Sequence, residues 1–183
     1  MPRNRAHLAR DDRMSEILDV AERTVRTDGF DSLSVSAVAR DVGVANNAIY
    51  WYFPSRDHLA VATFEHMVAK VLAEKTEAGG DLFDRVTWFV EQLAPFYPLR
   101  ASLHAWGRRS PVVQNYLDDL SARLRSLIRH VLERHVRPEE LDLATTSFAA
   151  TIQGTFLDST SLEETKDVVV FTLKRLIGDE TSE

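Results

Sequence analysis

Two adjacent asparagines, Asn46 and Asn47, are the side chains best suited to reading a nucleic acid in this sequence. An asparagine amide both donates and accepts hydrogen bonds, so it can pair with the N6 and N7 atoms of adenine in the major groove. The flanking Ala45 and Ala48 carry methyl groups that can contact the thymine methyl group. The pattern favours base recognition, although asparagine is also common near helix starts for structural reasons alone.

Side chains suited to holding phosphates lie close to these asparagines in the sequence. Tyr50 and Tyr52 offer hydroxyl donors. Ser34 stands at the expected start of a short helix, where its hydroxyl and the free backbone N–H groups can face a phosphate. Arg56 holds the same place at the start of a longer helix. The alternative is that the aromatic cluster only packs a core.

Two short helices separated by a glycine are expected to position these side chains. Ser34 caps the first helix, whose apolar residues recur at helical spacing as Val35, Val38, Ala39 and Val42. Gly43 can take the left-handed conformation of a tight turn, and Val44 can fill the corner. The second helix covers residues 45–53 and ends before Pro54. This pattern predicts a helix-turn-helix, in which the start of the second helix enters the major groove.

The run from Ile17 to Leu59 resembles the DNA-binding domain of the TetR family of bacterial transcriptional repressors. The resemblance rests on Gly29-Phe30, Leu33-Ser34-Val35, Val38-Ala39, Gly43-Val44, Ile49-Tyr50-Trp51-Tyr52-Phe53, Ser55-Arg56-Asp57 and Leu59. It implies a dimeric all-helical protein with DNA contacts from Ser34, Ser36, Asn46, Asn47, Tyr50, Tyr52 and Arg56, and from Arg3 and Arg5 in a minor groove. Two residues depart from the family pattern: Ala45 replaces a capping Ser or Thr, and Arg56 replaces Lys.

The rest of the chain reads as a series of longer helices. Breaks separate them at Gly79-Gly80, Pro95 to Pro98, Gly107 to Pro111, Arg137-Pro138 and Asp158 to Ser161. Neither strand alternation nor an internal repeat is present, so the expected fold is all-α. We expect a flexible basic arm over residues 1–12, the helix-turn-helix domain over 13–58, and a helical effector-binding and dimerisation domain over 59–183, which a long helix joins to it.

Aromatic residues concentrated in the middle segments predict a pocket for a small molecule. In the family that the sequence resembles, a ligand in such a pocket lowers affinity for the operator. The candidates are Trp88, Phe89, Phe96, His104, Trp106, Tyr116, Phe148 and Thr151. An apolar or aromatic compound is expected, because these segments lack a glycine-rich phosphate loop. For any single aromatic residue, the alternative is a place in the core.

The last two helices carry a candidate dimer interface. A stripe of small residues recurs with helical spacing along the first of them, where they would let a partner helix approach closely: Leu143, Ser147, Ala150, Gly154 and Leu157. The last helix adds Val169, Leu173 and Leu176 to the expected interface. The alternative is that both faces meet helices of the same chain.

Composition and missing motifs exclude several classes of function. The chain has 183 residues, 44% of them hydrophobic, so it can bury a core. With no cysteine it fits a reducing compartment, and with neither a membrane-length apolar stretch nor a signal sequence it is expected in the cytoplasm. The net charge of −6 argues against wholesale affinity for nucleic acid, but the basic residues gather at the N-terminus.

No enzyme, metal or cofactor is expected. The sequence has no nucleophile elbow, no phosphate-binding glycine loop and no zinc-binding pair of histidines. His130 and His135 stand five residues apart, on different faces of one helix, so a solvated helix is expected there and no metal site. One alternative to a ligand-responsive repressor stays open: a TetR-like DNA-binding or protein-interaction module without a small-molecule effector.

Overall fold

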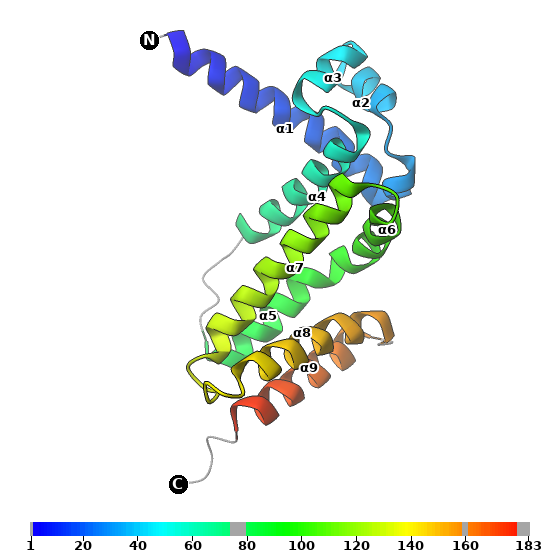
Figure 1. Ribbon diagram of the computed structural model, residues 1–183. Helices are drawn as coiled ribbons and strands as arrows, with labels where there is room; N and C mark the ends of the chain where they lie inside the picture. The colour runs from blue at the N-terminus through cyan, green and yellow to red at the C-terminus, as the bar shows by residue number, and fades with distance from the viewer. Residues whose placement is uncertain (1, 74–79, 159–160, 179–183) are drawn as a thin grey trace. The chain divides into compact units, whose positions relative to one another are not determined.

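The computed structural model describes residues 2–73, 80–158 and 161–178, with side chains given for most of these from residue 10 onward. Throughout these ranges the regular structure is helical and no strand occurs, so the all-α prediction is confirmed (Figure 1). Among the same residues, no helix has both the length and the apolar character that crossing a membrane requires.

The chain packs as two compact units. The first unit comprises Met1–Glu74 and Pro98–Leu117, and the second unit comprises Lys75–Tyr97 and Asp118–Glu183. On sequence, the DNA-binding domain was expected to end at residue 58. The compact unit that contains it extends further, because Leu103 and Trp106 of a later helix are buried in that unit.

The first unit is built on a short aromatic core. Its helices are α1 (Pro2–Asp28), η1 (Phe30–Ser32), α2 (Val35–Val42), α3 (Asn46–Tyr52), α4 (Arg56–Ala73), α6 (Tyr97–Gly107) and the start of α7 (Pro111–Leu132). The ring centroid of Phe30 lies 6.2 Å from that of Phe64 and 6.5 Å from that of Trp106. Tyr116 meets Phe64 edge-on at 6.2 Å. This core fixes the helices that carry the turn motif.

Helix α1 differs from the expectation. A flexible arm was predicted over residues 1–12, with a helix opening after it, but the backbone is helical from Pro2 onward. The segment is rich in arginine, alanine and leucine, which favour helix strongly enough to extend it. The side chains of Arg3 and Arg5 lie outside the described residues.

The second unit contains α5 (Leu82–Leu93), η2 (Ala94–Phe96), the rest of α7, α8 (Leu141–Asp158) and α9 (Leu162–Ile177). Helix α9 packs against both α8 and α5 (Figure 1). Capping defines two helix starts: Asp81 and Asp84 form a capping box on α5, and the Ser161 hydroxyl accepts a hydrogen bond from the backbone of Glu164 at 3.1 Å. The core residues of this unit include Val90, Leu132, Phe148, Ile152, Val169 and Leu173.

Candidate functional site

The turn between α2 and α3 has the geometry that the sequence predicts. Gly43 ends α2 in the left-handed region, with φ 78° and ψ 32°. The backbone N–H of Val44 then donates to the carbonyl of Ala39 at 2.9 Å. Only glycine takes this conformation without steric cost, so Gly43 turns the chain sharply enough to lay α3 against α2.

The start of α3 is held by a contact between two predicted DNA-binding residues. Ala45 is the N-cap and offers no side-chain hydrogen bond, as its missing hydroxyl requires. Instead, the Asn46 amide donates to the Ser36 hydroxyl at 3.0 Å and ties α3 to α2. Asn47 is exposed, and its amide makes no hydrogen bond to another described residue. Of the two asparagines, Asn47 is therefore the one whose amide has no partner among the described residues.

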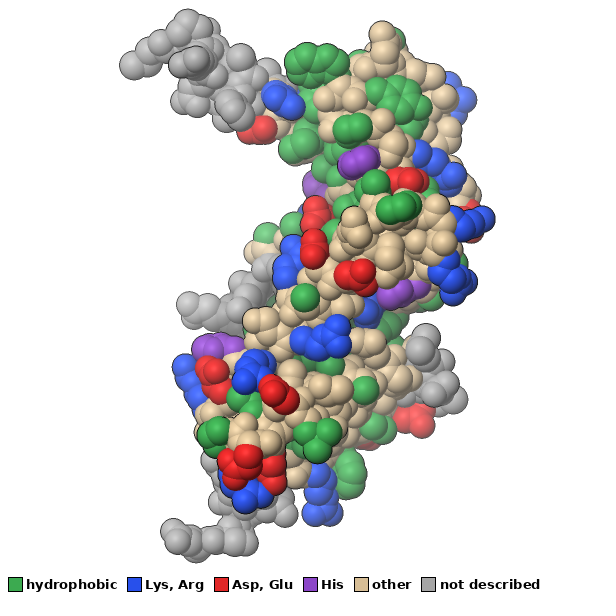
Figure 2. Space-filling view, viewed as in Figure 1, with side chains coloured by type: hydrophobic (Ala, Val, Ile, Leu, Met, Phe, Trp, Pro, Cys, Tyr) green, Lys and Arg blue, Asp and Glu red, His purple; other side chains and the backbone are tan. Residues whose placement is uncertain are grey.

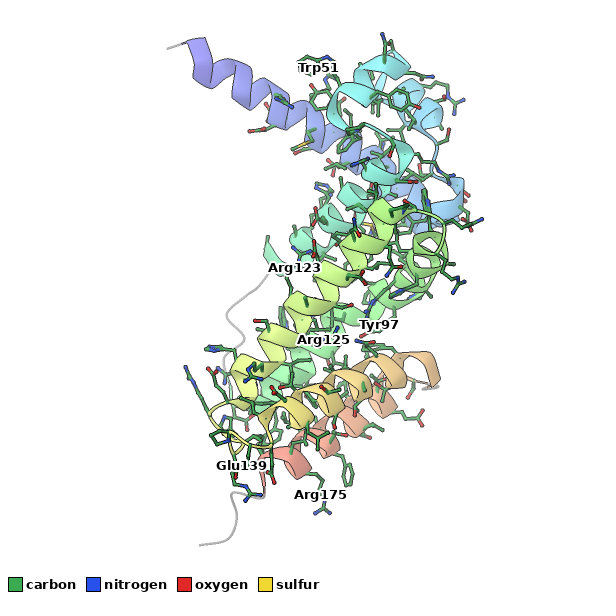
Figure 3. All side chains as sticks on the ribbon, viewed as in Figure 1. Trp51, Tyr97, Arg123, Arg125, Glu139 and Arg175 are labelled. Atoms are coloured by element: carbon green, nitrogen blue, oxygen red, sulfur yellow. The ribbon has the colours of Figure 1, made fainter. Side chains whose placement is uncertain are left out.

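An exposed aromatic surface continues along α3. The Trp51 side chain is 77% exposed and that of Tyr50 is 50% exposed, and Figure 2 shows hydrophobic side chains on the surface of α2 and α3. The Arg10 guanidinium lies 5.8 Å from the Trp51 ring and 5.9 Å from the Tyr52 ring. In Figure 3, Trp51 projects outward from α3. Sequence reasoning missed Trp51 and Arg10, although a tryptophan directly after Tyr50 was a visible signal.

Ser34 occupies the predicted N-cap position of α2 and has extended backbone geometry. Its carbonyl accepts from the N–H of Val38 at 3.0 Å, but its side chain makes no capping hydrogen bond. The hydroxyl is half-buried beside the first turn of α2. It is placed where a phosphate facing that helix end would meet it.

The guanidinium of Arg56, for which a phosphate contact is expected, has partners within the chain in this structure. Nε donates to the carbonyl of Leu33 at 2.7 Å, and Nη2 donates to those of Asp31 at 2.8 Å and Phe30 at 3.2 Å. The guanidinium also lies 4.4 Å from the Trp106 ring. The fork of donors on arginine matches the group of carbonyls around η1, of which that of Phe30 also accepts from the backbone N–H of Leu33 at 3.2 Å. Arg56 positions the loop before α2.

A charged network joins α1 and α4 inside the first unit. The Lys70 ammonium lies 2.6 Å from Asp19 and 2.8 Å from Glu22, and His66 Nε2 lies 2.9 Å from Asp19. Hydrogen bonds from Lys70 and then His66 lower the pKa of Asp19. Burial alone would raise the pKa of Glu22, but hydrogen bonds from Lys70 and Arg26 outweigh it and lower that pKa.

The same network includes a set of possible metal ligands. The ligand atoms of Asp19, Glu22 and His66 all lie within 4.8 Å of one another. However, the Lys70 ammonium already bonds both carboxylates and supplies the positive charge between them. The cluster is best explained as an ion-pair network that fastens α4 to α1.

The second unit contains a cavity of about 660 Å³ between α5, α7 and α8. Its lining comprises Leu82, Arg85, Val86, Trp88, Phe89, Leu127, Ile128, His130, Val131, Arg134, His135, Phe148 and Ile152. Three of these were predicted as ligand residues: Trp88, Phe89 and Phe148. Its volume lies within the range usual for small-molecule sites.

The structure does not bring the other predicted ligand residues to this cavity. Trp106 and Tyr116 pack in the aromatic core of the first unit, and Phe96 is buried in the second unit away from the cavity lining. His104 is exposed on α6. The Thr151 hydroxyl donates to the Ser147 carbonyl of its own helix at 3.0 Å. Aromatic content alone could not separate a core residue from a cavity residue.

Sequence reasoning also missed four basic or imidazole side chains of the cavity: Arg85, His130, Arg134 and His135. It assigned His130 and His135 to different faces of one helix. Helix α7 ends at Leu132, however, and the chain then turns. Helical spacing therefore does not apply between them, and both reach the same cavity.

The stripe on α8 that is expected at a dimer interface is exposed along part of its length. On α8, Leu143 is 71% exposed, Ser147 and Ala150 are also exposed, and a Cβ on Gly154 would meet nothing within 4 Å. The side chain of Leu157 lies outside the described residues.

The α9 part of that expectation is wrong in detail. Val169 and Leu173 are fully buried within this chain, and Leu176 packs partly buried against the same core. This face of α9 packs against α8 and α5 of the same chain. The exposed apolar residues of α9 are instead Phe171, at 60%, and Val168, at 38%.

The fold and the turn geometry together define an all-α protein with a helix-turn-helix unit. Residues 17–63 match the family model described as bacterial regulatory proteins, tetR family. Residues 17–63 therefore carry a DNA-binding domain of the tetR type, and the proteins to which the chain is similar are transcriptional regulators.

Two curated proteins and one solved structure illustrate the similarity. The fatty acid metabolism regulator protein of Bacillus subtilis (strain 168) is 25% identical over 122 residues, which are 66% of this chain and 61% of that protein. The HTH-type transcriptional regulator EthR of Mycolicibacterium smegmatis is 31% identical over 71 residues, 38% of this chain and 33% of that protein. The matched region thus spans less than two thirds of either protein.

A crystal structure of a putative TetR-family transcriptional regulator from Rhodococcus sp. superposes with a TM-score of 0.72 at 17% identity. The superposition covers 92% of this chain and all of that chain (100%). At this level of identity, the match establishes the shared fold. The matched proteins named here are all regulators, in line with the expectation that the chain is not an enzyme.

Proposed function

We propose that this protein is a repressor that binds operator DNA through α3 and is released from it by an apolar or aromatic small molecule. The observation that carries the proposal is the surface of α3. Asn47, Tyr50 and Trp51 stand exposed there, on a helix that Gly43 and the Asn46–Ser36 hydrogen bond fix in place. As a DNA-binding regulator it would act in the cytoplasm.

The exposed groups divide into base readers and phosphate holders. Asn47 is the proposed partner of an adenine edge. Asn46 and Ser36, which are hydrogen-bonded to each other at 3.0 Å, would orient the helix and contact the DNA beside it. Tyr50, Tyr52 and Ser34 are placed for phosphates or sugars. Arg3 and Arg5, at the start of α1, are the proposed minor-groove contacts.

The proposal includes a homodimer, since one helix-turn-helix reads only a half-site. The exposed apolar residues Leu143 and Phe171 of α8 and α9 support this, because such side chains gain by burial against a second copy. Phe171→Glu should convert the dimer to monomer in light scattering. A wild-type protein that is monomeric at micromolar concentration would contradict the proposed interface.

The cavity supports the effector part of the proposal. A ligand changes DNA affinity only if it binds the conformation that is incompetent for DNA more tightly. A coupling of about 1–3 kcal/mol would lower operator affinity about 5–150-fold. Compounds that stabilise the protein in a thermal-shift screen should therefore release the operator in a DNA-binding assay.

The experiment that tests DNA recognition compares two asparagines. A preferred operator is first selected from random duplexes and then located by genome-wide mapping. Asn47→Ala should weaken binding to this operator by about 1–3 kcal/mol and leave binding to random DNA nearly unchanged. The matched control is Asn115→Ala, which changes an exposed asparagine on α7 and should alter neither. Equal loss on both kinds of DNA would reject Asn47 as a base reader.

A further inference from the structure

The cavity of the second unit combines an apolar interior with a basic rim. Ile128, Phe148 and Ile152 are buried in its wall. The side chains of Arg85, His130, Arg134 and His135, by contrast, are exposed at its surface. No Asp or Glu occurs among the described residues that line it.

The rim of the cavity is basic, although the chain as a whole is acidic. The chain carries 28 acidic residues against 22 lysines and arginines, so a basic lining without an acid departs from the average surface. One acid stands nearby: Glu133 pairs with His130 at 2.7 Å. Within the part of the chain that the structure describes, neither Arg85 nor Arg134 forms an ion pair. These two guanidinium groups therefore keep their charge available to a ligand.

We infer that the effector is an anionic amphiphile, with an apolar body and one acidic head group such as a carboxylate or sulfonate. This inference sharpens the effector part of the proposed function and rests on it. The body lies against the apolar wall, and the head group meets Arg85 and Arg134 at the rim. A carboxylate can accept the paired N–H groups of a guanidinium, which gives both charge and direction to the contact. A cationic amphiphile would instead face like charges.

Two fluorescent probes test the charge of the ligand directly. They are 1-anilinonaphthalene-8-sulfonate and N-phenyl-1-naphthylamine, which share an aromatic body and differ by the sulfonate. The wild type should bind the sulfonate about tenfold more tightly, a difference of about 1.4 kcal/mol. Added salt should narrow this gap, because exposed charges are screened. Decanoate should displace the bound probe better than decan-1-ol does.

Variants locate the binding site and the source of its charge preference. Arg85→Gln and Arg134→Gln should each weaken sulfonate binding several-fold and leave the neutral probe unchanged. The matched control is Arg125→Gln, on α7 outside the lining (Figure 3), which should change neither probe. Val131→Trp, which fills the cavity, should weaken both probes.

Four results would overturn the inference. The first two are equal affinity for the two probes and a preference for the sulfonate that persists in both arginine variants. The third is a loss of sulfonate affinity in Arg125→Gln as large as in Arg85→Gln or Arg134→Gln. The fourth is a loss of probe binding as the chain dimerises, which would assign the surface to a second copy. None of these measurements uses DNA, so their failure is distinct from failure of the proposed regulator. If the sulfonate binds as expected but leaves operator affinity unchanged, the ligand class stands and the proposed release is rejected.

Discussion

In the first unit, the candidate DNA-reading side chains come from one short run, residues 34–52, whereas the cavity of the second unit draws on α5, α7 and α8. This run contains the turn, the N-cap positions of its two helices and the helical spacing of their apolar residues. A local sequence pattern therefore specifies it. The cavity exists only where three distant segments meet. Motif residues can therefore be named from the sequence in the first unit, while cavity residues need the packed structure.

The largest expected effect is on the free energy of unfolding, which should fall more when a packed aromatic ring is removed than when a ring that lines the cavity is removed. Phe30 is fully buried between Phe64 and Trp106, so Phe30→Ala should lower the free energy of unfolding by about 3–5 kcal/mol. Phe89 lines the cavity and is only half-buried, so Phe89→Ala should cost about 1–2 kcal/mol. Denaturant unfolding followed by circular dichroism measures both. Equal losses would show that the Phe89 ring is packed as tightly as that of Phe30.

The next prediction compares one arginine from each unit. Arg56→Ala removes three hydrogen bonds to carbonyls and the contact with Trp106, and should cost about 1–2 kcal/mol of unfolding free energy. Arg134→Ala should stay within about 0.5 kcal/mol, because this exposed side chain has no ion pair among the described residues. If Arg56→Ala left stability unchanged and weakened only DNA binding, the phosphate role predicted from the sequence would be restored.

Two glycine substitutions are expected to change stability in opposite directions. Gly43 has a positive φ of 78°, so Gly43→Ala should destabilise the first unit by about 1–2 kcal/mol. Gly154 is helical and a Cβ there would meet nothing within 4 Å, so Gly154→Ala should stabilise the monomer by about 0.5–1 kcal/mol. Thermal unfolding at a concentration too low for dimerisation tests this. A loss of stability in the Gly154 variant would mean that α8 does not form a regular helix there.

The smallest effect concerns pH and the Asp19–Glu22–His66–Lys70 network. Both carboxyl groups have a folded-state pKa below their ordinary values of 3.8 and 4.5. The network therefore contributes its stability above those ordinary values and loses it as the pH falls through the lower folded pKa values. Asp19→Asn should flatten the pH dependence of the melting temperature below about pH 4.5. The comparison variant is Asp119→Asn on α7, where the carboxylate is exposed and forms no ion pair among the described residues, and it should change that dependence less. If the melting temperature depends on pH in the same way in both variants and the wild type, the network does not contribute to the pH dependence of stability.

In the first unit, some features could be predicted from the sequence and others could not. Spacing and the glycine were sufficient to predict the α2–α3 turn. Ala45, which replaces a capping Ser or Thr, is the N-cap of α3 and makes no side-chain hydrogen bond there. The same reasoning placed Arg56 on a phosphate. Its true partners are carbonyls 23 to 26 residues earlier in the chain, and no local pattern encodes such a contact.

The sequence by itself determined most of the helices, their breaks and the turn motif, because these depend on side-chain spacing and on backbone preferences within a few residues. It did not determine where α1 begins. It did not determine which face of an amphipathic helix would be buried. On α9, Val169 and Leu173 went to the core while Phe171 stayed exposed. Only the tertiary structure decided this, and also which aromatic side chains line the cavity, because burial depends on the neighbours that distant segments supply.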